Sequence, residues 1–200
     1  MSSQSAAPAN RILSAILPEL DRLAAYDDES VVHDTWVRQR YDGGFAASYR
    51  PARTAAVVTA WHEAGHAVAA LAVGARFSSA SIRQGTGGQG RVHKIQGDGD
   101  RAFVVAAAGQ IAERLRDWSL PDNDDLLRSW LATWRHDGGD ALRFRKTLDR
   151  DEVAGWRYAE TLLTPRRLQI RQVARALLVH PRYLRYDVVA AIARTIQETP

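Results

Sequence analysis

Two histidines and a glutamate in the segment TAWHEAGHAVAALAVG, residues 59–74, have the most chemically specific spacing in this 200-residue chain. In an α-helix, four residues turn the chain through about 400°, so His62 and His66 project from one face, one turn apart. Both imidazoles can therefore reach the same metal ion. Glu63 lies next to that face without pointing along it, which leaves its carboxylate free to hold a water molecule instead of the metal.

This His-Glu-x-x-His spacing is typical of zinc hydrolases. We therefore predict Zn²⁺ as the cofactor, His62 and His66 as ligands, and Glu63 as the catalytic base. Zinc lowers the pKa of a bound water to about 7, and Glu63 would take its proton and later return it to a leaving amine. The alternative is two core histidines beside a surface glutamate. It is weaker because each imidazole in an Ala/Val face would need its own hydrogen-bond partner.

Composition restricts the remaining ligands and the class of protein. The chain has no cysteine, so a transition metal must be held by His, Asp or Glu. The longest apolar stretches, residues 67–75 and 102–109, are about half the length that a bilayer requires, and the first ten residues lack the apolar centre of a signal peptide. These features predict a soluble, cytoplasmic protein without membrane insertion. The net charge of +4 is modest, so no nucleic-acid partner is predicted.

Helical spacing of apolar residues dominates the chain. We read residues 1–10 as a flexible tail, residues 11–50 as an N-terminal helical appendage and residues 51–200 as the main domain. That domain opens with a long helix from 51 to 74, and the alternating segments 76–83 and 90–96 then predict a β-hairpin. Helices at 100–118 and 121–136 and a helical last third follow. The predicted fold class is mainly α (α+β), with a small β-hairpin or sheet next to the helix of His62 and His66.

The third metal ligand must come from another part of the chain. The acidic run PDNDD, residues 121–125, begins a predicted helix and offers carboxylates. This run belongs to a wider set of segments: HEAGHAVAA, SASIRQGTGGQGR, AAAGQIAERL and NDDLLRSWLA. Through them, roughly residues 51 to 195 resemble the proteolytic domain of the FtsH-type zinc metalloproteases, which is normally part of a membrane-bound, ATP-driven machine.

The resemblance implies a zincin-like helical metallopeptidase domain whose third zinc ligand is an aspartate at the start of a later helix. The dipeptide Asn123-Asp124 matches the residue types of that family's motif. Asp125 instead matches the position of the motif's aspartate in its helix, because Leu126 follows it directly and the small Ser129 lies one turn further on. Asp125 is therefore the preferred ligand and Asp124 the alternative. Glu113 is a rival ligand or a hydrogen-bond partner of a zinc histidine, and the alternative is a surface glutamate on a helix.

The function that these features imply is ATP-independent zinc endoproteolysis of polypeptides. The resemblance implies an edge strand beside the zinc that binds an extended peptide through backbone hydrogen bonds, formed by Ser79, Ala80, Ser81 and Ile82. The glycine-rich segment GTGGQGRV has Arg91 and Val92 where a phosphate-binding loop needs Lys and Ser or Thr, so no ATPase is expected here. We therefore expect flexible or unfolded substrates, unless a separate ATPase delivers them. Two alternatives stay open: a regulatory zinc-binding module without turnover, and a narrow regulatory protease for one repressor-like partner.

The C-terminal helices carry two further patterns. Arg167, Arg171 and Arg175 are spaced by four residues, which predicts a solvated helix face or, alternatively, a docking site for an acidic partner or nucleic acid. Trp130 and Trp134 are expected to serve core or interface packing. The oligomeric state is not predicted.

Overall fold

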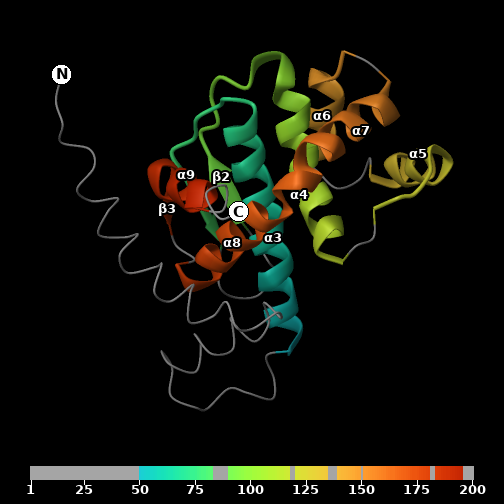
Figure 1. Ribbon diagram of the computed structural model, residues 1–200. Helices are drawn as coiled ribbons and strands as arrows, with labels where there is room; N and C mark the ends of the chain where they lie inside the picture. The colour runs from blue at the N-terminus through green and yellow to red at the C-terminus, as the bar shows by residue number, and fades with distance from the viewer. Residues whose placement is uncertain are drawn as a thin grey trace.

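The computed structural model describes residues 50–82, 90–117, 120–134, 139–149, 151–180 and 183–195. In this part of the chain the protein is mostly helical with one small antiparallel sheet, which confirms the predicted fold class (Figure 1). The expected tail, residues 1–10, and all but the last residue of the expected appendage lie outside the described residues. Within the described ranges, no helix combines the length and the apolar character needed to cross a lipid bilayer.

Helix α3, Arg50–Ala72, is the central element and carries the two histidines. Its Ala-rich sequence presents small side chains on most faces, and residues such as Ala64 are fully buried. The helix stops just before Gly74, whose φ of 78° is readily adopted only by glycine. The N–H of Ala75 donates to the carbonyl of Ala70 at 2.8 Å, which completes a glycine-terminated helix end.

Helix α4, Ala102–Asp117, packs against α3 at short range. An ideal Cβ on Gly65 of α3 would lie 2.4 Å from the backbone oxygen of Ala108 and 2.6 Å from Cβ of Ala112. Only glycine therefore permits the observed distance between the two helices. This close approach brings α4 against the face of α3 that carries the histidines.

A three-stranded antiparallel sheet lies beside α3 in the order β2-β1-β3. Its strands are β1, Ser79–Ile82, β2, Gly90–His93, and β3, Leu184–Arg185. β1 pairs with β2 along its whole length, which confirms the predicted hairpin, and with β3 at Ser79 and Ala80. The expectation that β1 is an edge strand is therefore wrong at Ser79 and Ala80, whereas Ser81 and Ile82 pair with β2 alone within the described residues. β2 is an outer strand of the described sheet.

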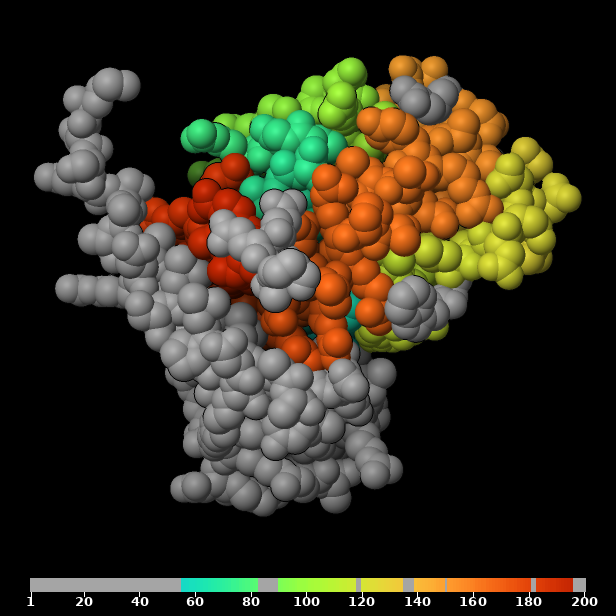
Figure 2. Space-filling view, in the orientation of Figure 1, coloured from blue at the N-terminus to red at the C-terminus, as the bar shows by residue number. Residues whose placement is uncertain are grey.

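Three helices of the second half meet in a cluster of aromatic rings. They are α5, Asp124–Thr133, α6, Gly139–Thr147, and α7, Glu152–Leu163. The ring centre of Trp134 lies 5.4 Å from that of Phe144 and 5.6 Å from that of Trp156. Trp130 stacks on Trp134 at 5.5 Å, so both tryptophans serve packing, as expected. α5 lies at the side of the described part of the molecule, and its surface adjoins that of α7 (Figure 2).

Helices α8, Arg167–Val179, and α9, Tyr186–Thr195, also pack on α3. The arginine row on α8 does not form the expected solvated face. Arg175 is only 2% exposed, and the guanidinium of Arg167 lies 5.7 Å from the ring centre of Trp61. That expectation is wrong because α8 packs against α3 and α4, and Arg167 also donates to the backbone oxygen of Leu115 on α4.

Candidate metal centre

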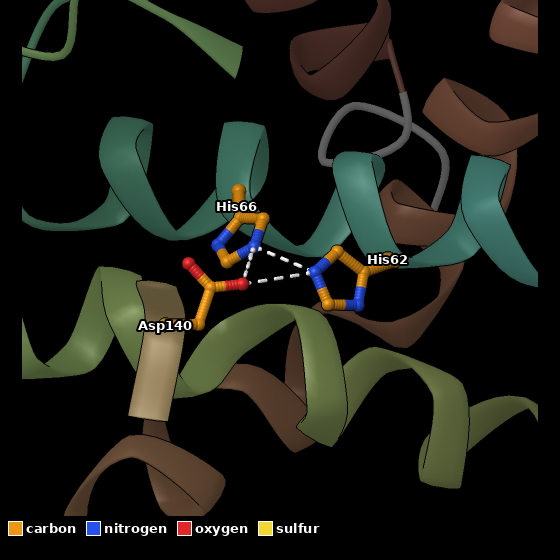
Figure 3. Close-up of side chains that lie close together, drawn as sticks. All are labelled: His62, His66 and Asp140. Carbon is orange, nitrogen blue, oxygen red and sulfur yellow. Dashed lines mark hydrogen bonds and ion pairs between the residues drawn. The ribbon is translucent and has the colours of Figure 1, made fainter. Parts of the chain in front are cut away.

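The two histidines of α3 meet the first turn of α6. Nε2 of His62 lies 3.0 Å from Nε2 of His66, and each of these nitrogens lies 3.1 Å from Oδ2 of Asp140. Figure 3 shows the two rings and the carboxylate turned toward one another. Within the described residues, these are the three His, Asp or Glu side chains that lie close enough together to hold one metal ion.

The opposite ring nitrogen of each histidine is held by an oxygen acceptor. Nδ1 of His66 lies 2.6 Å from the backbone oxygen of Val105, and it must donate because a carbonyl oxygen only accepts. Nδ1 of His62 lies 2.6 Å from Oε1 of Glu113, a carboxylate on α4. In the neutral imidazoles these bonds place the proton on Nδ1. The lone pair of each Nε2 then points to the position between the two imidazoles and Oδ2 of Asp140.

The donor set fits zinc. Three His or carboxylate side chains are the usual protein ligands of a catalytic zinc site, which keeps a further position for water or substrate. Zinc–ligand bonds of about 2.0–2.1 Å in a tetrahedral arrangement separate the ligand atoms by about 3.3 Å. The observed separations of 3.0 and 3.1 Å are close to this value. His62, His66 and Asp140 are therefore suitable residues to hold the ion.

Glu63 is buried beside this group and touches strand β2. The residue is 6% exposed, and its carboxylate accepts the backbone N–H of Val92. An ideal Cβ on Gly90 would lie 2.4 Å from Cγ of Glu63, so a side chain at position 90 would displace the glutamate. Burial raises the pKa of Glu63 above its ordinary value, even though the nearby His66 and His62 act to lower it. A raised pKa suits a carboxylate that must take up a proton near neutral pH.

The metal-free site is an ion-paired cluster. Burial by itself lowers the pKa of His62, but the hydrogen bonds with Asp140 and Glu113 outweigh it and raise this pKa to about 10. Burial likewise raises the pKa of Asp140, but its bonds with His62 and His66 hold the pKa well below its ordinary value. A metal cation must therefore displace a proton from this cluster when it binds at neutral pH.

Gly109 of α4 lies directly against the ring of His62. An ideal Cβ at this position would lie 2.5 Å from both Nε2 and Cε1 of the imidazole. Any side chain here would push the ring away from its present position. The absence of a side chain at Gly109 thus allows His62 to adopt the orientation that the site requires.

The structure places the expected third ligands away from the histidines. The side chain of Asp125 is 98% exposed and lies 3.4 Å from Arg128. The side chain of Asp124 is 63% exposed and lies 3.1 Å from Arg157. Neither carboxylate belongs to the converging group, in which Asp140 takes the place expected for Asp125.

Sequence reasoning missed Asp140 although a signal was present. Asp140 lies in the first turn of a helix, directly after two glycines in the segment DGGDALRF. The same criterion, an acid at a helix start, selected Asp124 and Asp125, which also lie in a first turn. Of the roles considered for Glu113, its geometry agrees with the hydrogen-bond partner, since it contacts Nδ1 of His62 and is not one of the three converging donors.

Comparison with known proteins gives one family. Residues 43–115 match the model of a family described as Peptidase M50B-like. The matched segment contains His62, Glu63, His66 and Glu113 and ends before Asp140. The match supports a metallopeptidase family in general and does not specifically support the FtsH-type resemblance. No curated protein and no solved structure matches the chain.

Proposed function

We propose that this chain is a zinc-dependent endopeptidase that cleaves flexible or unfolded polypeptides. The proposal rests on the convergence of His62, His66 and Asp140 within about 3 Å of one another, with buried Glu63 beside them. The match to a metallopeptidase family supports the same reaction class. The residues offer what metal-assisted amide hydrolysis requires, three metal ligands and a buried carboxylate, and an outer strand lies next to that carboxylate.

The chemistry divides between the ion and Glu63. When bound, zinc acts as a Lewis acid that polarises a peptide carbonyl and lowers the pKa of a water molecule to about 7. Glu63 takes a proton from this water as the water oxygen bonds to the carbonyl carbon. The C–N bond then breaks, and Glu63 returns the proton to the leaving nitrogen. The N–H of Val92 keeps the carboxylate in place against β2 during both transfers.

Strand β2 replaces β1 as the proposed site for the substrate backbone. Within the described residues, β2 pairs with β1 and lies on the outer side of the sheet. Because its Val92 contacts Glu63, a peptide added along β2 would pass the catalytic carboxylate. Such a peptide must be extended, which favours flexible or unfolded substrates. Backbone pairing depends little on side chains, so broad sequence selectivity follows.

The experiment that tests this function compares the parent protein with Glu63→Gln. Zinc content is measured by elemental analysis, and cleavage is measured on casein as an unstructured substrate. We expect about one zinc per chain in both proteins. Cleavage should fall by about 10²- to 10⁴-fold in Glu63→Gln, the range typical of a lost general base. Asp125→Asn removes an exposed carboxylate and serves as the matched control, with zinc and cleavage unchanged.

Each other outcome selects a different interpretation. Full cleavage by Glu63→Gln would contradict the proposed role of that residue. A parent protein that binds no zinc would contradict the metal centre itself. Zinc binding without cleavage by the parent would favour the regulatory binding module. Cleavage restricted to one captured partner would favour the narrow regulatory protease.

A further inference from the structure

The third donor of the candidate metal centre comes from a different helix than the other two. His62 and His66 are fixed on α3, whereas Asp140 lies in the first turn of α6. Its Oδ2 must stay near both imidazoles, and a functional site tolerates displacements of only about 0.5 Å. The affinity of the site for metal therefore depends on how α6 is held.

An ion pair anchors α6 at a position one turn from Asp140. Arg143 follows Asp140 by three residues, so the two side chains lie on the same side of the helix, one turn apart. The guanidinium of Arg143 donates to the carboxylate of Asp98. The Asp98 side chain is 13% exposed and that of Arg143 is 38% exposed, so the pair is partly withdrawn from solvent.

The chain around Asp98 presents its carboxylate to α6. Gly97 and Gly99 have φ values of 80° and 47°, so glycine at both positions shapes the turn. Asp98 occupies the N-cap position of the short helix η1, Gly99–Arg101, where aspartate normally accepts a backbone N–H. Its side chain makes no such capping bond. The carboxylate is directed instead to Arg143.

The same turn connects the ion pair to the sheet. Gln96, two residues before Asp98, forms a β-bridge with Arg76 that continues the pairing of β1 and β2. The ion pair thus joins the end of the sheet, whose strand β2 contacts Glu63, to the helix that carries Asp140. The other contacts that the described residues give α6 include its packing on α4 and contacts with the start of α7. Its buried residues Ala141 and Phe144 are apolar, and Arg145 bonds to Glu152 at the start of α7.

We infer that Asp98 and Arg143 are positioning residues that hold Asp140 at the metal centre. This inference rests on the proposed function, because it assigns the pair a role in metal binding. Neither residue belongs to the group of three converging donors. The pair acts by limiting the movement of α6 relative to α3 and the sheet.

The test measures zinc affinity and amide exchange in Asp98→Asn and Arg143→Gln. Zinc affinity, measured by competition with a chromophoric chelator, should fall about tenfold in each, the lower end of the range for groups that orient metal ligands. Hydrogen exchange of the α6 amides in the metal-free protein should become faster. The double variant Asp98→Arg/Arg143→Asp should restore both quantities. A purely structural ion pair would lower stability without this selective effect on zinc and α6.

Arg145→Gln is the matched control, because it removes another ion pair of the same helix, with Glu152. It should keep the parental zinc affinity. An equal loss of affinity in this control would overturn the inference, as would unchanged affinity and exchange in Asp98→Asn. Loss of cooperative unfolding in both single variants would also overturn it, since the pair would then hold the whole fold. A parent without zinc affinity would contradict the proposed function instead, and the exchange data on the metal-free protein would still decide the role of the pair.

Discussion

Nδ1 of His62 lies 2.6 Å from Oε1 of Glu113, although 51 residues separate them in the chain. The bond turns Nε2 of His62 toward His66 and Asp140. Helix α4 thus sets the orientation of the His62 imidazole, a candidate metal ligand on α3. A carboxylate in this position fixes the tautomer of the imidazole and raises its basicity toward a metal.

The first prediction concerns this bond. Glu113→Gln keeps the shape of the side chain and removes its negative charge, so zinc affinity should fall roughly 10- to 100-fold. Competition with a chromophoric chelator measures the change. Asp117 lies on the same helix and its side chain is 52% exposed, so Asp117→Asn serves as the control and should leave the zinc affinity unchanged. Parental affinity in Glu113→Gln would show that the negative charge of Glu113 does not strengthen His62 as a metal ligand.

The second prediction identifies the third donor. Asp140→Asn should lose more affinity than Glu113→Gln, because it removes a carboxylate that faces both imidazoles. Asp124→Asn and Asp125→Asn should bind zinc as the parent does, because both carboxylates are exposed and lie outside the group. Elemental analysis after dialysis against a weak chelator separates the variants. Loss of zinc in Asp125→Asn with retention in Asp140→Asn would reverse the assignment.

The parts of this fold that were predictable from the sequence depend on short-range spacing. His62 and His66 lie four residues apart, so helix geometry alone places them together. The alternating segments around the glycine-rich turn likewise predicted the hairpin of β1 and β2, which is confirmed. β3 was missed because a strand of two residues, Leu184–Arg185, is too short to show an alternating pattern.

The third donor could not be chosen from local pattern. Asp125 and Asp140 both lie in the first turn of a helix, so the sequence criterion treats them alike. What separates them is tertiary packing: α6 packs on α4 beside the histidines, whereas α5 packs on α7. Asp140 lies 74 residues beyond His66, and no spacing rule spans that distance. The central position of β1 was missed for the same reason, since it depends on β3.

The third prediction concerns pH. Because its pKa is raised to about 10, His62 carries a proton in the metal-free protein at neutral pH, and this proton must leave when zinc binds. The pKa of Asp140 lies well below its ordinary value, so Asp140 releases none. Zinc affinity should therefore rise about tenfold per pH unit from 7 to 9. Calorimetry in buffers of different ionisation enthalpy should find about one proton released at pH 7.5, and release of none would contradict the prediction.

The fourth prediction separates metal binding from catalysis by means of two glycines. In Gly109→Ala the new methyl group would overlap the imidazole of His62, so zinc affinity should fall, with about 1–3 kcal/mol of stability lost to overpacking. In Gly90→Ala the methyl group would meet Cγ of Glu63 instead, so zinc should be retained while kcat falls. Gly139→Ala is the control, since its Cβ would meet no atom within 4 Å. Zinc titration and casein cleavage on all three proteins check this. Equal loss of zinc in Gly90→Ala and Gly109→Ala would contradict the prediction that Gly90 affects only Glu63 while Gly109 affects the ligand His62.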